Sequence, residues 1–253
     1  MFRIFDIFSS KPNLVLFLVR IPVVVIAFTI HEMSHAYAAH KLGDDTAKNL
    51  GRLTLNPLKH LDPIGCITLL LFGIGWAKPV PVMTRNFENP KKGMLLTSLA
   101  GPLSNIILSL IGLLLSVTVS TMFGFTISGS LFTESVMSRK IVHPGLYLIC
   151  LFFYLFHWVN LSLAIFNMIP IPPLDGSRIA LIFLPEKAYF GIMRYERYIM
   201  IGFLILMYAV GFSWLGTAMD WVSGMLFKLV SFIPGLGSAV SIPDVTLGLL
   251  SLI

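Results

Sequence analysis

Two histidines four residues apart, with a glutamate directly after the first, occur in the segment His31-Glu32-Met33-Ser34-His35. On a helix, side chains at i and i+4 project from one face, so both imidazoles can ligate one Zn²⁺ while Glu32 activates a metal-bound water. The alternative is that both histidines are polar packing residues of a helix bundle. Three ionisable groups within an apolar segment are costly without a use. The pattern therefore predicts a metal site that performs hydrolysis.

The segment around this motif is long and apolar, and it is one of several. Of the 253 residues, 56% are hydrophobic and 12% are charged, whereas soluble domains carry about 25% charged residues. Long apolar stretches cover residues 14–40, 94–122, 146–169 and 199–219, near the roughly 20 residues that a bilayer span needs. Residues 64–76 and 221–233 are shorter and predict re-entrant or interfacial segments, the second with a fifth span as its alternative. We expect one integral membrane domain over residues 1–253.

The basic residues are unevenly distributed over the loops. If the first span runs from outside to inside, the cytoplasmic loops hold 12 of the 18 lysines and arginines, eight in residues 41–92 and four in residues 178–197. This asymmetry predicts a multi-pass protein of the cell membrane with its N-terminus outside and its site open to the cytoplasm. His31 would lie about 15 Å inside the helix end at Lys41. The basic residues are not clustered with aromatics, so we expect no nucleic-acid partner.

Two segments between the first and second spans look extended. Residues 51–57 alternate in polarity and end in a turn signal, and the prolines of residues 75–82 bar a helix but fit an edge strand. We therefore predict an all-α polytopic membrane protein with four to five transmembrane helices and a small membrane-associated β-sheet or re-entrant loop within residues 48–85. The alternative is a cytoplasmic loop without a catalytic part.

A catalytic zinc normally has three protein ligands, so the motif needs a partner. His40 lies nine residues after His31 and falls on the opposite helix face. Asp175 is the better candidate, because it follows the third span in Asn167-Met168-Ile169-Pro170-Ile171-Pro172-Pro173-Leu174-Asp175-Gly176, where three prolines open the helix. The alternative is that Asp175 caps the next helix.

His-Glu-Met-Ser-His together with the segment that ends in Leu-Asp-Gly resembles the site-2 protease family of intramembrane zinc metalloproteases. Residues 51–57, 75–82 and 100–105 also resemble segments of its short prokaryotic branch, whose members carry no PDZ or CBS domain. In that family the two motif histidines and the aspartate bind zinc, and the motif glutamate is the base. The resemblance implies one Zn²⁺ per chain with ligands and base at His31, His35, Asp175 and Glu32.

The resemblance further implies that transmembrane protein substrates are cut within or near the lipid bilayer. A substrate must be locally extended, so the predicted strands would pair with it and Asn167 would bind its freed backbone groups. Asn105 would do the same or brace helix packing, and Gly101 would permit close helix approach. His157 reads as a packing residue, and His60 and His143 as incidental. Two other functions stay open: a membrane zinc transporter and a catalytically silent scaffold.

Overall fold

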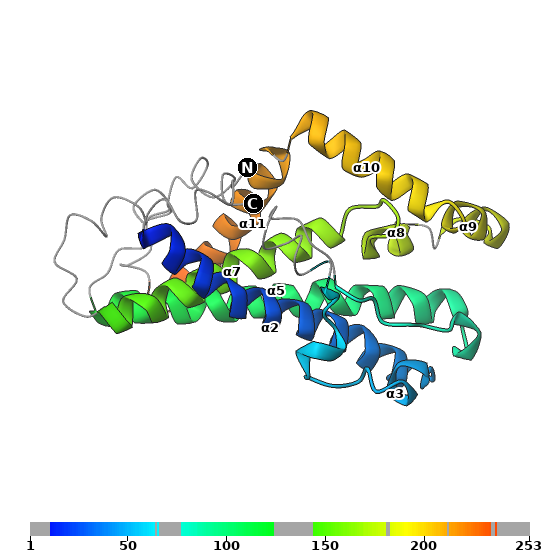
Figure 1. The fold of residues 1–253 in the computed structure, drawn as a ribbon, viewed down its shortest axis with the longest axis horizontal. Coiled ribbons are helices and arrows are strands. Elements are labelled where there is room, and N and C mark those ends of the chain that lie inside the picture. The colour runs from blue at the N-terminus through cyan, green and yellow to red at the C-terminus, as the bar shows by residue number, and fades with distance from the viewer. Residues whose placement is uncertain are drawn as a thin grey trace.

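Three long helices dominate the computed structural model, which describes residues 11–63, 65, 77–123, 144–180, 183–211, 213–233 and 236. They are α2 (Lys11–Lys41), α5 (Pro90–Phe123) and α7 (Pro144–Asn167), and they lie side by side (Figure 1). All three are long and apolar enough to cross a membrane. They correspond to the first three predicted spans and support a multi-pass membrane protein.

The apolar core lies where α5, α7 and α11 (Ser213–Ser231) meet. Leu113 and Leu161 are fully buried there, and Trp158 and Leu215 nearly so. Gly112 of α5 lies close to the α7 backbone: a Cβ atom at this position would lie 2.8 Å from the backbone nitrogen of His157 and 2.9 Å from the carbonyl oxygen of Phe153. The two helices therefore touch backbone to backbone, as small residues allow in membrane proteins.

The predicted fourth span over residues 199–219 is not confirmed as one helix. The chain forms α10 (Glu196–Val210) and then α11, which also contains most of the segment at residues 221–233. Between them Gly211 has φ 82°, a left-handed conformation that ends a helix and that glycine adopts without strain. Among the described residues, three helices meet the requirements of a membrane span.

The predicted small sheet is also not confirmed. Within the described part of the chain, the extended pairing is one antiparallel bridge between Leu61 and Ala77. Around residues 51–57 side chains bond locally instead: the Thr54 hydroxyl accepts the Asn56 N–H, and Asn56 caps the short helix η1 (Pro57–Lys59). Such local bonds compete with strand pairing. Residues 66–76, most of the predicted re-entrant segment, lie outside the described residues, as does the loop at residues 124–143.

Short helices carry the remaining described chain. They are α3 (Thr46–Asn49), η2 (Thr84–Asn86), α8 (Asp175–Ala180) and α9 (Glu186–Met193). α8 follows the proline-rich turn after α7 and packs on α5. Leu174, just before α8, is buried against Phe203 of α10. The turn that carries the predicted third ligand is thus held between α5 and α10.

The backbone contact at Gly112 predicts a loss of stability on adding one methyl group. Gly112→Ala must force α5 and α7 apart, so we expect a cost of about 1 to 3 kcal/mol in the free energy of unfolding. Thermal unfolding of the detergent-solubilised protein measures it. Gly202→Ala on α10 is the matched control, because a Cβ atom there meets nothing within 4 Å and alanine is the better helix former. Equal stability of the two variants would contradict this packing.

Candidate metal centre

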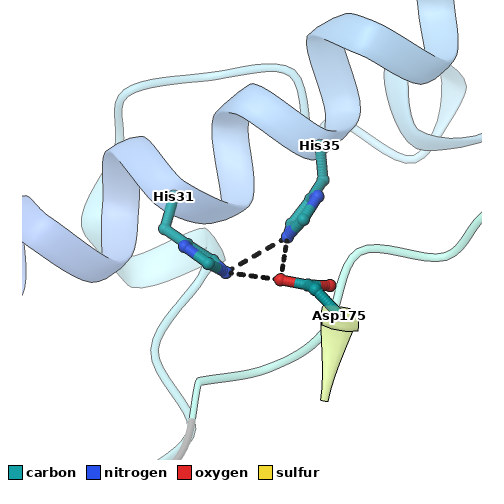
Figure 2. Close-up of side chains that lie close together, drawn as sticks. All are labelled: His31, His35 and Asp175. Carbon is teal, nitrogen blue, oxygen red and sulfur yellow. Dashed lines mark hydrogen bonds and ion pairs between the residues drawn. The ribbon is translucent and has the colours of Figure 1, made fainter. Parts of the chain in front are cut away.

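His31 and His35 project from the same face of α2 and are almost completely buried, with 5% and 8% of their surface exposed. Their Nε2 atoms lie 3.1 Å apart. Figure 2 shows both rings turned toward one point, opposite Asp175 at the start of α8. The helical spacing therefore places the two imidazoles as the sequence predicted.

Asp175 completes the cluster. Its Oδ2 atom lies 3.2 Å from the Nε2 atom of His31 and 3.2 Å from that of His35. Donor atoms about 2.0 to 2.1 Å from a tetrahedral Zn²⁺ would be separated by about 3.3 Å. The three separations of 3.1, 3.2 and 3.2 Å fit a zinc ion. Among the described residues, His31, His35 and Asp175 form the group of three histidine, cysteine, aspartate or glutamate side chains whose donor atoms lie close enough together to hold a metal ion.

The second nitrogen of each imidazole has its own acceptor. His31 Nδ1 lies 2.5 Å from the Asn105 Oδ1 atom, and His35 Nδ1 lies 2.7 Å from the Thr97 carbonyl oxygen. A carbonyl oxygen accepts only, so each Nδ1 carries the proton and each Nε2 presents a lone pair. Asp175 Oδ2 is buried and has no hydrogen-bond donor within the described structure. Three lone-pair atoms that face one another need a cation between them, so the residues present fit the metal.

Asn105 is fully buried, and both ends of its amide are engaged. Its Oδ1 faces His31, and its Nδ2 donates to Asn160 Oδ1 at 2.8 Å. Asn160 in turn donates to the Phe156 carbonyl oxygen within α7. We predicted Asn105 to bind substrate or to brace helix packing, and these contacts favour orientation of His31. Asn160 is not among the residues predicted from the sequence, although an asparagine inside an apolar span is a signal of a polar contact.

Gly101 on α5 makes room for the ligands. A Cβ atom at this position would lie 2.7 Å from His31 Cε1 and closer still to His35 Nε2. The close approach predicted for Gly101 is therefore an approach to the two imidazoles. α5 thus supplies both the space for the rings and the acceptors that orient them.

Asp175 is aimed by the turn that precedes it. A Cβ atom on Gly176 would overlap the Met168 carbonyl group, so the chain doubles back with its backbone in contact at these two residues. The carboxylate faces the histidines instead of capping α8 (Figure 2). A carboxylate that binds zinc must be anionic, and two imidazole Nε2 atoms around a cation are compatible with that state.

Glu32 lies beside the cluster and is also nearly buried. Its Oε2 atom accepts the Val80 N–H at 3.0 Å, so the loop before α5 reaches the proposed base. Asn167, the last residue of α7, is half-buried and donates to the Leu163 carbonyl oxygen at 2.9 Å. The contact between Met168 and Gly176 places Asn167 and Asp175 on the same turn.

The remaining histidines lie apart from the cluster. His40 lies away from the cluster, as its helix face predicted, and it pairs with Asp45 near the end of α2. His157 is buried between the Ser109 and Ser223 hydroxyls at 2.8 and 2.9 Å, which confirms a packing role. His60 is fully buried and bonds the Thr54 carbonyl oxygen, so its description as incidental is wrong. His143 lies outside the described residues.

The geometry predicts which replacements empty the metal site. Asp175→Asn removes the anionic ligand, so zinc content should fall well below that of the unchanged protein when both are dialysed against the same chelator. His40→Ala is the matched control and should keep its zinc, because its imidazole pairs with Asp45. Metal analysis of the purified proteins measures both. Full zinc in Asp175→Asn with loss in His40→Ala would reverse the ligand assignment.

Comparison with known proteins places this geometry in a family. The model of peptidase family M50 matches residues 19–209. YwhC of Bacillus subtilis, inferred to be a zinc metalloprotease, is 42% identical over 182 residues, which cover 72% of this chain and 76% of YwhC. The zinc metalloprotease MJ0392 of Methanocaldococcus jannaschii is 27% identical over 179 residues, 71% of this chain and 38% of its own length. No solved structure matches. The chain therefore belongs to peptidase family M50, the site-2 protease family of membrane zinc metalloproteases.

Proposed function

We propose that this protein binds one Zn²⁺ per chain and hydrolyses peptide bonds in or near the transmembrane segments of membrane-protein substrates. The observation that carries this proposal is a convergence of side chains. His31 and His35 of the apolar helix α2 meet Asp175 of α8, and Glu32 lies beside them on α2. Four ionisable side chains at such a place are expensive to bury without a function. Membership of the family supports the general chemistry, and the site geometry supports the roles proposed for the residues.

Each residue of the site has one task. His31, His35 and Asp175 would hold the zinc ion, which would supply Lewis acidity toward a water molecule and toward the scissile carbonyl. Glu32 accepts the proton of the attacking water and returns it to the leaving amine. Asn105 and the Thr97 carbonyl keep the two imidazoles in the tautomer that presents Nε2.

Substrate binding is proposed for Asn167, which lies on the same turn as Asp175. Its amide oxygen can accept an N–H of an unwound substrate. We predicted that the edge at residues 77–82 also pairs with substrate. The Lys78 N–H is bonded to the His60 carbonyl oxygen and the Val80 N–H to Glu32, and Pro79 and Pro81 have none. Pairing at this edge would therefore rely on carbonyl groups and on the N–H groups of Ala77 and Val82.

The orientation follows from the charge asymmetry of the loops. We propose that the protein resides in the cell membrane with the Lys41 end of α2, and hence the site, open to the cytoplasm. Cysteines introduced at Lys48 and Ser135 test this orientation in intact cells. An impermeant reagent should label position 135 and leave position 48 unlabelled, and the opposite result would reverse the access route.

The two competing functions differ in what they require. A zinc transporter needs ligand sets on several spans that form a path, whereas the described residues bring together the one set at His31, His35 and Asp175. A silent scaffold has no use for a glutamate beside that set. Zinc uptake by vesicles that contain the pure protein would favour the transporter.

Glu32→Gln separates metal binding from catalysis. Glu32 is the base and not a ligand, so the variant should retain zinc while cleavage of a transmembrane substrate falls by at least the roughly 10² to 10⁴ that acid–base catalysis contributes. Zinc analysis and a cleavage assay on the reconstituted protein give the two readouts. Cleavage at the unchanged rate would remove Glu32 from the mechanism, and loss of zinc would make it a ligand.

Asn167→Ala tests substrate binding. It removes a group that we propose to be desolvated against the substrate backbone, a loss of about 1 to 3 kcal/mol. Cleavage should therefore fall by about one to two decades with zinc retained. A substrate that carries helix-breaking glycine should be affected less, because it unwinds more readily. Full activity with a helix-stable substrate would exclude Asn167 from substrate binding.

A further inference from the structure

We propose that Arg52 is a positioning residue for Glu32, and that it acts through the backbone of the segment Lys78-Pro79-Val80. This inference rests on the proposed function, because it assigns Glu32 as the base. Arg52 lies 20 residues after Glu32 along the chain. The connection between them is made of hydrogen bonds.

The segment presents a single backbone donor to the site. Val80 stands between Pro79 and Pro81, and neither proline has an N–H group. In Pro79-Val80-Pro81 the one N–H group is therefore that of Val80, and it donates to Glu32 Oε2 at 3.0 Å. Proline on both sides also confines Val80 to an extended backbone, so the donor keeps its direction. Because a carboxylate has two oxygens, a bond at Oε2 leaves Oε1 to take the proton of water.

Arg52 fixes this donor from the other side of the segment. Its side chain is buried, with 7% of the residue exposed. Its Nη2 atom donates to the Lys78 carbonyl oxygen at 2.5 Å and to the Pro79 carbonyl oxygen at 3.3 Å. These are the two carbonyl groups that precede the Val80 nitrogen along the chain, and the second belongs to the same peptide group as the Val80 N–H. A charged donor on two successive carbonyls makes stronger bonds than a neutral group would.

Arg52 is itself anchored to α3, the short helix that packs on α2. Its backbone N–H donates to the Ala47 carbonyl oxygen at 2.8 Å, and Ala47 is fully buried next to α2. The Lys78 N–H donates to the His60 carbonyl oxygen at 2.7 Å. The segment is therefore held against the same framework that carries Glu32.

A second anchor holds the chain after Val80, and it also comes from the segment that follows α2. Asp44 is fully buried just after α2, and its carboxylate accepts the Met83 N–H and the Asn86 side-chain amide, each at 2.7 Å. Burial opposes ionisation of Asp44, but the hydrogen bonds from Thr46, Met83 and Asn86 outweigh it and lower its pKa. Asp44 is thus a fixed anion. Val80 lies between an arginine anchor and an aspartate anchor.

The physical consequence concerns the freedom of the Glu32 side chain. A glutamate has three side-chain torsions, and holding it in one rotamer is costly unless a partner fixes it. General-base catalysis requires the carboxylate within hydrogen-bond reach of the water. Partners that orient such groups typically contribute 10- to 100-fold in activity. Loss of Arg52 should therefore lower kcat and leave zinc affinity and KM nearly unchanged.

Four variants of the full-length, reconstituted protein test the proposal: Arg52→Gln, Val80→Pro, their combination, and Arg85→Gln. Val80→Pro deletes the donor to Glu32 in a backbone already restricted by its neighbours. Arg85→Gln is the matched control, because Arg85 is exposed on the same loop. Arg52→Gln and Val80→Pro should each lower kcat by about 10- to 100-fold with zinc content and KM unchanged. The double variant should be no worse than the poorer single variant, since both act through one hydrogen bond.

Amide hydrogen exchange gives a readout without activity. Residues 78–83 include two prolines and therefore contain four amides, so exchange at Val80 is readily followed in one peptide. Arg52→Gln and Glu32→Ala should both accelerate exchange there, and Arg85→Gln should not. Unchanged exchange in both variants would overturn the proposal, also for a variant too unstable to assay.

The outcomes separate this inference from the function on which it rests. Unchanged kcat in Arg52→Gln, losses that multiply in the double variant, or loss of zinc in either single variant would overturn the positioning role while Glu32-dependent cleavage persists. Absence of zinc- and Glu32-dependent cleavage in the unchanged protein would instead overturn the proposed function, and hydrogen exchange would still show whether Arg52 holds Val80 against Glu32.

Discussion

The structure depends on the burial of three lone-pair atoms against one another. His31 Nε2, His35 Nε2 and Asp175 Oδ2 lie within 3.2 Å of each other, on or beside an apolar helix. Such an arrangement is repulsive without a cation and favourable with one, since the interior screens charge weakly. The imidazoles cannot turn away, because their Nδ1 atoms are held by Asn105 and Thr97. The arrangement therefore fits a bound cation.

α5 is the support on which this arrangement rests. On its face toward α2, Gly101 has no side chain and so leaves room for the two imidazoles. The same face carries the Thr97 carbonyl and the Asn105 amide, which bond to them. Its contacts with α7 support the same residues. Gly112 lets the α7 backbone come close, and Asn160 of α7 accepts a hydrogen bond from Asn105. Within a membrane the association of helices depends on close packing and interhelical hydrogen bonds, and here both serve the ligands directly.

The proposed base, Glu32, is supported from a different part of the chain. The ligands are oriented by helices, whereas Glu32 is approached by the irregular segment around Val80, held by Arg52 and Asp44. Irregular backbone near a membrane must find partners inside the protein. The carbonyls of Lys78 and Pro79 find one in Arg52, and the N–H of Val80 finds one in Glu32. The proposed metal ligands and the proposed base are thus supported by separate sets of contacts.

Sequence alone determined the features that depend on local spacing and composition. The i, i+4 histidines, the adjacent glutamate, three apolar spans and an isolated aspartate among prolines follow from helical periodicity and from the cost of charge in lipid. Tertiary structure decided everything that joins distant residues: His31 to Asn105, Asn105 to Asn160, and Glu32 to Val80. It also decided against the strand at residues 51–57 and the continuous span at residues 199–219, where side-chain bonds and the left-handed Gly211 prevail over the hydrophobic pattern. The local sequence pattern indicates which side chains are costly to bury. The partner of each one depends on long-range packing, so only the tertiary structure shows it.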